Sequence, residues 1–293
     1  MRVVYIGMVE FSLRILEQLV ELNTEIVGVC TLKKSKFSAD HADLSFFSQA
    51  HAIPSFYADD INSIETLSWV QEKSPDVIFC FGWSRLIKQD LLELAPLGVV
   101  GFHPAALPAN RGRHPLIWAL VLGLKKTAST FFFMDAGADS GDILSQQEIE
   151  ITDQDDARTL YDKMIQTALV QIAEFLPRLA TGSFQRIKQN ARFSNSLRKR
   201  GRADGKIDWR MSAQSIHNLV RGLTTPYIGA HFLVDGKEIK VWKSAIVVDA
   251  RSNIEPGKVL LQSSAGTVVK CGVDAISLLI TEPEFEPSIG SYL

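Results

Sequence analysis

Two short polar segments of the sequence carry side chains that can move a proton. Residues 101–118 (GFHPAALPANRGRHPLIW) hold two histidines, two arginines and an asparagine, and residues 135–144 (DAGADSGDIL) hold three aspartates. Histidine is the usual proton donor and acceptor near neutral pH, and a carboxylate beside it orients the ring and favours its charged form. We therefore predict that one of these aspartates pairs with His103.

Other chemistry is open to the same segments. The aspartates of residues 135–144 follow the pattern Asp-x-x-x-Asp-x-x-Asp, which offers oxygen ligands to a metal but lacks the spacing of a complete calcium loop. The side chains of residues 101–118 could also simply face solvent. Cys30, Cys80 and Cys271 are far apart, so they predict neither a disulfide framework nor a zinc site. We expect no metal, and we expect Cys30 and Cys80 to be buried thiols.

Common nucleotide-binding fingerprints are absent from the sequence. Gly7 ends an apolar run near the N-terminus, but the second and third glycines of a dinucleotide-binding motif are missing. A phosphate-binding P-loop, a Gly-x-Ser-x-Gly motif and a His-Glu-x-x-His motif are missing as well. The missing glycines disfavour a nicotinamide-dependent dehydrogenase.

The reactive segments must be positioned by regular structure, and the first 180 or so residues alternate between two patterns. Strand-like apolar runs cover residues 3–7, 26–31, 77–81, 98–102 and 127–134, and helical periods cover residues 12–22, 44–52, 64–73, 86–94 and 156–176. This alternation predicts an α/β fold with a Rossmann-like, mostly parallel sheet. Ligands of such sheets bind beyond the carboxyl ends of the strands, where His103 and residues 83–85 are expected.

The loop that follows the fourth predicted strand is rich in proline. Pro104, Pro108 and Pro115 lead us to expect no helix within residues 101–118. A stiff polar loop at the end of a strand is a good support for catalytic side chains.

The composition changes after Thr181, and residues 185–202 are polar and basic. We predict a catalytic domain over residues 1–182, a linker over residues 183–203 and a smaller domain over residues 204–293. A basic linker can be merely solvated, or it can neutralise an anionic part of a substrate. Short apolar runs separated by glycine-containing turns predict a β-barrel of the OB-like kind in the smaller domain, over residues 230–234, 239–247, 257–261, 267–270 and 275–281.

The overall composition is that of a globular protein. Of the 293 residues, 46% are hydrophobic, and 31 basic residues stand against 33 acidic ones for a net charge of −2. This balance disfavours nucleic acid as a partner, although a local basic patch is compatible with it. The N-terminus is not typical of a signal peptide and no apolar run is long enough to span a membrane, so we expect a soluble, cytoplasmic protein.

Several segments together resemble the folate-dependent formyltransferase family, which includes methionyl-tRNA formyltransferase, glycinamide ribonucleotide formyltransferase and the nucleotide-sugar N-formyltransferases. The resemblance covers nearly the whole chain, in order and at family spacing. It rests on His103, Leu107-Pro108, Arg111-Gly112, residues 135–144, 204–209 (DGKIDW), 218–229 (NLVRGLTTPYIG) and Val241-Trp242. Asp139 stands 36 positions after His103, which is the family's spacing between its catalytic histidine and aspartate.

The resemblance implies 10-formyltetrahydrofolate as the formyl donor and no metal. Family members hold the pterin ring largely through backbone groups. The corresponding residues here are Arg85, Leu86, Ile87, Asp135, Ala136, Gly137, Ala138 and Asp139, and Arg113 lies at a further position that lines this site in the sugar-modifying relatives.

In the implied reaction His103 transfers the proton and donates a hydrogen bond to the developing oxyanion, while Asp139 supports it. The family usually places an asparagine two residues before this histidine as a second oxyanion donor, but this chain has Gly101 there. We expect Asn110, on the same loop, to take that role as a third catalytic residue, or else a backbone N–H.

Two acceptors compete for the formyl group. The amino-acid sequences of residues 110–118 and 225–230 are similar to the corresponding segments of the nucleotide-sugar enzymes. This resemblance implies that the acceptor is a nucleotide-linked amino sugar, such as a 4-amino-4,6-dideoxy sugar for surface polysaccharide or O-antigen synthesis. Arg111, Arg113 and Tyr227 are then the candidate substrate-binding residues, and a homodimer is possible because such relatives are often dimers. The alternatives are a methionyl-tRNA formyltransferase and a catalytically impaired protein that binds folate or nucleotide-sugar.

Overall fold

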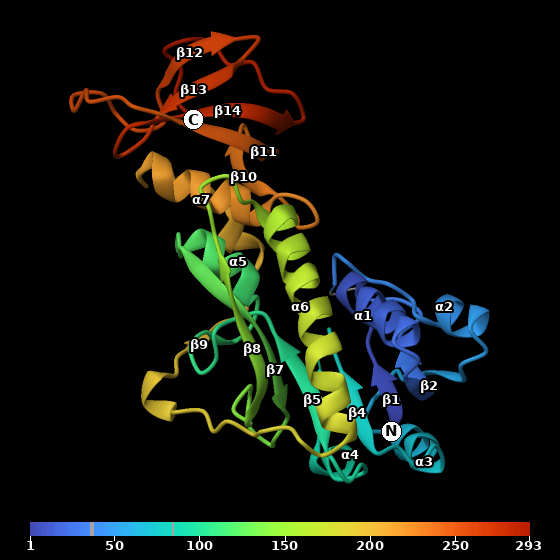
Figure 1. Cartoon of the computed structure of the whole chain (residues 1–293). Helices are drawn as coiled ribbons and strands as arrows, with labels where there is room; N and C mark the ends of the chain where they lie inside the picture. Colours follow the sequence, from blue (N-terminus) through green and yellow to red (C-terminus); the bar gives the residue numbers. More distant parts are fainter. Residues whose placement is uncertain (36–37, 84) are drawn as a thin grey trace. The chain divides into compact units, whose positions relative to one another are not determined.

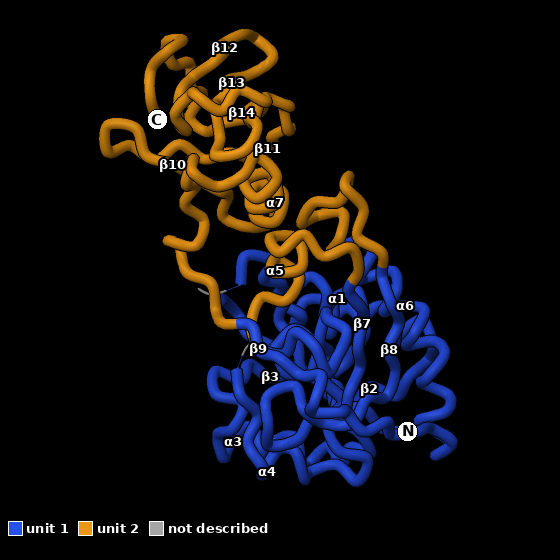
Figure 2. The backbone as a smooth tube through the Cα atoms, turned by 90° about the vertical axis from the view of Figure 1, so that its left-hand side faces the viewer, with its two compact units in different colours: residues 1–112, 127–149, 162–197 blue, residues 113–126, 150–161, 198–293 orange. Residues whose placement is uncertain are grey.

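The computed structural model describes residues 1–35, 38–83 and 85–293. Ser84, which follows the third predicted strand, lies outside the described residues. The chain forms two compact units, each assembled from separate stretches of sequence (Figure 2). Unit 1 contains residues 1–112, 127–149 and 162–197, and unit 2 contains residues 113–126, 150–161 and 198–293. Unit 2 thus takes in two stretches that precede the predicted linker.

The described residues form helices and strands that alternate in the first half of the chain and give way to consecutive strands in the second (Figure 1). The helices are α1 (Glu10–Glu21), α2 (Ser45–Ala50), α3 (Ile64–Glu72), α4 (Gln89–Leu92), α5 (Pro115–Val121), α6 (Ala157–Ala180) and α7 (Ala213–Leu223), with 3₁₀ turns at Ala191–Phe193 and Arg202–Gly205. The strands are β1 (Arg2–Ile6), β2 (Glu25–Thr31), β3 (Ser55–Tyr57), β4 (Val77–Cys80), β5 (Val99–His103), β6 (Arg111–Gly112), β7 (Lys126–Phe133), β8 (Ile143–Glu150), β9 (Ser196–Leu197), β10 (Ala230–Val234), β11 (Lys237–Val247), β12 (Val259–Ser263), β13 (Gly266–Lys270) and β14 (Ala275–Glu282).

Unit 1 is built on a seven-stranded sheet in the order β3-β2-β1-β4-β5-β7-β8. The strands from β3 to β5 pair in parallel, and β7 pairs with β5 in the antiparallel direction. Val100 of β5 faces Phe133 of β7, and His103 faces Thr130. The chain therefore leaves β7 beside the beginning of β5, at the opposite end from His103. The mostly parallel α/β sheet predicted from the sequence is confirmed.

Helices cover both faces of this sheet, because its central strands are apolar on both sides. Phe11 of α1 stacks on Phe102, and Phe175 of α6 contacts Phe79 and Phe131, so α1 and α6 lie on one face. On the other face, buried residues of β1 and β4 pack against α3 and α4. Cys30 and Cys80 are free and buried, as predicted, and burial raises the pKa of the Cys30 thiol to about 12.

Unit 2 is built on a five-stranded antiparallel sheet in the order β10-β11-β14-β13-β12. The amphipathic helix α7 packs its buried face, including Ile216 and Val220, onto this sheet and onto Ile117 of α5. The five predicted strands of the smaller domain are therefore present as an antiparallel β structure.

One sequence expectation is wrong. Pro115 does not prevent a helix in residues 101–118 but starts one, because it occupies the first turn of α5, where the missing proline N–H has no helical partner to lose. No helix of the described residues is long and apolar enough to cross a membrane.

Candidate active site

His103 is the last residue of β5, and its exposed fraction is only 4%. Strands β4 and β5 are parallel neighbours, so His103 lies on the same edge of the sheet as the end of β4. This is the carboxyl edge at which the sequence predicted the site.

Two oxygen atoms face the His103 ring. Its Nε2 lies 2.8 Å from the main-chain carbonyl oxygen of Asn110, and its Nδ1 lies 3.6 Å from Oδ2 of Asp139. The structure thus brings together His103, Asp139 and Asn110. Asn110 reaches His103 through its main chain, whereas the sequence argument had assigned a role to its side chain.

Both partners of His103 have left-handed backbone conformations that are rare outside glycine. The φ angles are 61° at Asn110 and 54° at Asp139. Asparagine and aspartate adopt this conformation more readily than other non-glycine residues, and contacts with neighbouring segments help to hold it here. For Asp139 one such contact is the Gly112 N–H, which donates to Oδ2 at 2.8 Å.

A segment of the predicted linker holds the loop that contains Asn110. Asn195 Oδ1 accepts from the Asn110 N–H at 2.6 Å, Asn195 Nδ2 donates to Asn110 Oδ1 at 3.2 Å, and the Asn195 carbonyl accepts from the Arg111 N–H at 3.0 Å. Directly after it, β9 pairs with β6. The close approach explains Gly112, since a Cβ there would lie 2.4 Å from the Leu197 carbonyl oxygen.

Gln189 connects the same loop to the loop that contains Asp139. Its Oε1 accepts from Nε and Nη2 of Arg111, at 3.2 and 2.6 Å. Its Nε2 donates to the carbonyls of Asp139 and Gly141, at 2.9 and 2.7 Å. The Arg111 guanidinium is therefore engaged in holding the loop. Sequence reasoning missed both Gln189 and Asn195, because a polar segment without periodicity gives no sign of what it contacts.

The position of the missing family asparagine is occupied by a neighbouring side chain. A Cβ at Gly101 would lie 2.8 Å from Cγ and 3.1 Å from Sδ of Met134, and 3.2 Å from the ring of Phe132. The glycine therefore leaves no empty space beside His103, because Met134 fills it.

The residues expected to hold a pterin lie after β4 and after β7. Arg85 donates to the Asp59 carbonyl, and the Leu86 carbonyl accepts from Asn62 at 2.9 Å. The Leu86 side chain is 67% exposed. Beside them the indole Nε1 of Trp83 is buried and has no hydrogen-bond partner among the described residues. After β7, Asp135 Oδ1 accepts from the Gly137 N–H and from Ser140 Oγ, which shapes residues 135–139 into a compact turn.

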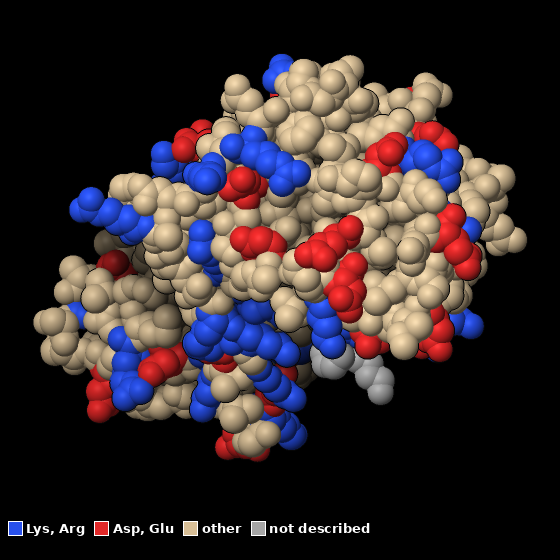
Figure 3. Space-filling model, turned by 90° about the horizontal axis from the view of Figure 1, so that it is seen from below, with Lys and Arg blue, Asp and Glu red and all other residues tan. Residues whose placement is uncertain are grey.

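A group of basic residues in unit 2 surrounds Trp118. The guanidinium groups of Arg198 and Arg200 lie 5.4 and 4.6 Å from the centre of its ring. Arg200 is 9% exposed, and its buried Nε has no partner among the described residues. Burial, together with Arg113, Lys199 and Arg200, lowers the pKa of His114. On the face shown in Figure 3, Lys and Arg gather in one area, and both signs of charge are mixed over the rest.

Tyr227 is half-buried in unit 2, in the loop after α7, where it packs against the core of that unit.

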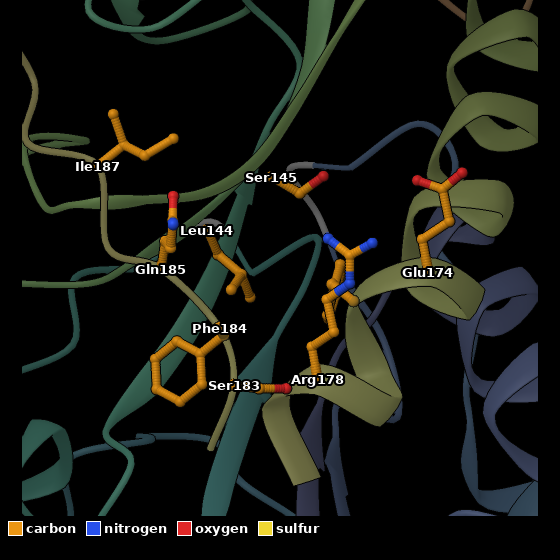
Figure 4. A pocket seen from close by; sticks show the side chains of 9 residues that line it. Leu144, Ser145, Glu174, Arg178, Ser183, Phe184, Gln185 and Ile187 are labelled. Atoms are coloured by element: carbon orange, nitrogen blue, oxygen red, sulfur yellow. The ribbon is translucent and has the colours of Figure 1, made fainter. Parts of the chain in front are cut away.

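A cavity of about 330 Å³ in unit 1 lies apart from these residues, since none of the predicted site residues lines it (Figure 4). Its wall comes from β8, α6 and the following segment, with Glu174 and Arg178 as the charged groups. Within residues 1–35, 38–83 and 85–293, no group of three or more His, Cys, Asp or Glu side chains is arranged to hold a metal ion.

Known proteins share both the sequence pattern and the fold. Residues 1–173 match the sequence model of the formyl transferase family, and residues 200–288 match that of the formyl transferase C-terminal domain. The chain is 32% identical to a methionyl-tRNA formyltransferase of Acetivibrio thermocellus, over 98% of this chain and 93% of that protein. It is 33% identical to the bifunctional polymyxin resistance protein ArnA of Wigglesworthia glossinidia brevipalpis, over 83% of this chain and 37% of that protein.

Similar solved structures include two N-formyltransferases. One is WlaRD, a sugar 3N-formyl transferase crystallised with dTDP and 5-N-formyl-THF, with a TM-score of 0.72, 18% identity and coverage of 97% of this chain and 99% of that chain. The other is the N-formyltransferase from Helicobacter canadensis in complex with folinic acid and dTDP-3-aminofucose, with a TM-score of 0.71, 16% identity and coverage of 95% and 99%. At these identities the likeness establishes a shared fold.

Proposed function

This chain belongs to the formyl transferase family and is an enzyme that transfers formyl groups, and we propose that it moves a formyl group from 10-formyltetrahydrofolate to the amine of a nucleotide-linked amino sugar. Residues 1–182 are proposed to form the catalytic domain that binds both substrates, and basic residues of the linker, residues 183–203, are proposed to add contacts to the nucleotide-sugar. Residues 204–293 are proposed to form the smaller domain, with residues 183–203 as the linker between the two.

The observation that carries the choice of acceptor is the compact group of cations around His114 and Trp118. The Gly112 N–H donates a hydrogen bond to Asp139, and Arg113 and His114 are the next two residues of the sequence. Arg113, Lys199 and Arg200 are close enough to lower the pKa of His114. A few cations in one place match the two phosphates of a nucleotide-sugar, whereas a transfer RNA needs an extended basic surface. A net charge of −2 is consistent with the smaller ligand.

Folate binding is supported by two unusual features at the end of β4. The buried Trp83 Nε1 has no hydrogen-bond partner among the described residues, so a ligand acceptor there would satisfy it. The exposed Leu86 offers an apolar surface to a planar ring. We propose that Arg85, Leu86, Ile87 and residues 135–139 hold the donor, which supplies the reactive formyl carbon.

The chain's own groups then handle the proton and the charge. His103 accepts the proton that the attacking amine loses and returns it to the nitrogen that leaves, and while it is protonated it donates a hydrogen bond to the oxygen on which charge develops. Asp139 supports the positive charge that His103 carries between these two transfers. The second oxyanion donor is the Asn110 side chain or a backbone N–H.

A transfer RNA acceptor is the second candidate, because the methionyl-tRNA formyltransferase named above matches nearly the whole chain. The deciding experiment offers the purified chain 10-formyltetrahydrofolate with either a panel of nucleotide-linked amino sugars or charged initiator transfer RNA. We expect transfer to at least one sugar and a raised KM for it in Arg113→Ala and Lys199→Ala. Efficient transfer to the RNA with none to the sugars would reverse the assignment. Tight folate binding with no transfer to any amine in a single turnover would instead identify a binding protein.

A further inference from the structure

The hydrogen bond between His103 and Asn110 determines which ring nitrogen carries the proton. A carbonyl oxygen has no hydrogen to give, so a 2.8 Å contact with it requires Nε2 to be the donor. In the neutral ring the lone pair is then on Nδ1, the nitrogen that faces Asp139 at 3.6 Å. The Asn110 carbonyl therefore makes Nδ1 the atom that can accept and return a proton.

The Asn110 carbonyl points at His103 in a backbone conformation that is left-handed, with φ at 61°. A non-glycine residue adopts this conformation at a cost and needs outside contacts to stay in it. Asn195 provides them, since its side chain bonds to both the main-chain N–H and the side-chain oxygen of Asn110. Its own carbonyl fixes the next residue, Arg111.

We propose that Asn195 is a positioning residue for formyl transfer: it holds Asn110 so that the Asn110 carbonyl keeps the proton of neutral His103 on Nε2. This inference rests on the proposed function and deepens it. Under this proposal Asn110 contributes to catalysis through its main-chain carbonyl, which fixes the tautomer of His103. The alternative is that the Asn110 side chain contributes as an oxyanion donor. The proton cycle balances, because the Nδ1 lone pair takes one proton from the attacking nitrogen and gives one to the leaving nitrogen.

Two substitutions separate the two roles of Asn110. Asn110→Gly removes the side chain but keeps the carbonyl and favours the left-handed conformation. We expect it to lower kcat much less than Asn195→Ala does, since it keeps the carbonyl and loses only a neutral hydrogen bond at an exposed site. We expect Asn195→Ala to lower kcat by about 10- to 100-fold through misplacement of the carbonyl, with the KM for folate changed by less than about twofold. Asn195→Asp keeps the acceptor for the Asn110 N–H and should recover part of the loss.

A direct readout of the tautomer makes the test independent of catalysis. In chain labelled with ¹⁵N-histidine, the ring shifts of His103, assigned with His103→Gln, report which nitrogen is protonated. We expect the Nε2–H form in the wild type and in Asn110→Gly, and a mixture in Asn195→Ala. The matched control is Asn190→Ala, the same change in the same segment; among the described residues the Asn190 side chain accepts a hydrogen bond only from the nearby Arg192 N–H.

Three results would overturn the proposal. The first is an Nδ1–H tautomer in the wild type. The second is an Asn195→Ala variant with unchanged kcat and tautomer. The third is a loss of about 100-fold in Asn110→Gly with the tautomer intact, which would assign the side chain as the oxyanion donor. If the wild type formylated no sugar, the shifts would still test the placement of the proton, so failure of the proposed function would be distinguishable.

Discussion

Nδ1 of His103 and Oδ2 of Asp139 lie 3.6 Å apart, although the strand that leads to Asp139 ends beside the beginning of β5 rather than beside His103. Hydrogen bonds from Gly112 and Gln189 hold the Asp139 loop in place. The pair is therefore produced by loop packing.

Removal of the Asp139 charge should impair the chemical step. Asp139→Asn keeps an acceptor for the Gly112 N–H but no longer supports a charged His103, so we expect kcat to fall about 100-fold or more. Folate affinity, measured by fluorescence titration, should remain close to that of the wild type. Asp142→Asn in the same loop is the control and should be nearly fully active. Equal rates for the two variants would exclude Asp139 from the reaction.

Restoring an asparagine at position 101 should require room to be made for it. Gly101→Asn brings a Cβ to 2.8 Å from Cγ of Met134, so we expect a loss of about 1–3 kcal/mol in the free energy of unfolding. The double variant with Met134→Ala should lose less than the sum of the single changes, because the two sites share one space. Urea unfolding of the four proteins measures this, and strict additivity would contradict the packing described.

Acid should weaken the fold through two half-buried histidines, His114 and His217. Burial is the largest cause of the lowered pKa of both His114 and His217, and nearby arginines add to it. The unfolded chain therefore binds protons more readily, and the stability due to the neutral rings is present above pH about 6.5 and is lost as the pH falls below it.

The check is the free energy of unfolding at pH 7.5 and 5.5. His217→Gln, or His114→Asn, which tolerates the left-handed φ of 55° at that position, should lose less stability between these pH values than the wild type. An unchanged pH dependence in both variants would rule out these histidines as its source.

Arg221 should be important for the stability of unit 2. Arg221 is 7% exposed, and its guanidinium donates to the carbonyls of Thr152 and Asp155, both at 3.0 Å, and to Asn218 Oδ1 at 2.9 Å. Arg221→Met removes all three hydrogen bonds at a buried position, so we expect a loss of about 1–3 kcal/mol in urea unfolding. The exposed Arg210→Met should cost less than about 1 kcal/mol. Similar losses for both would show that burial of Arg221 has no special effect.

The parts of the fold that the sequence predicted well are those with strong periodicity. The apolar runs at residues 26–31 and 77–81 became β2 and β4, and the helical period from residue 156 became α6. Strand β8 was missed, because only its two ends carry buried side chains and the polar residues between them give no strand signal.

The candidate site could be predicted only in part for a similar physical reason. His103 directly follows an apolar run, so its position at the carboxyl edge of the sheet could be predicted from the sequence. The partnership of Asn110 with Asn195 was not, because it joins residues 85 positions apart through amide groups that are common in any loop. The left-handed backbone at Asn110 is also invisible in the residue type alone.

The segment that holds the catalytic loop has a consequence for recombination between family members. The first matched family region ends at residue 173, and the second begins at residue 200. Gln189 and Asn195 therefore lie in the stretch that neither region covers. A chimera joined at that apparent boundary would take His103 from one parent and its supporting amides from the other. A crossover placed after Leu197 would instead inherit the histidine, the aspartate and the residues that orient them as a single block.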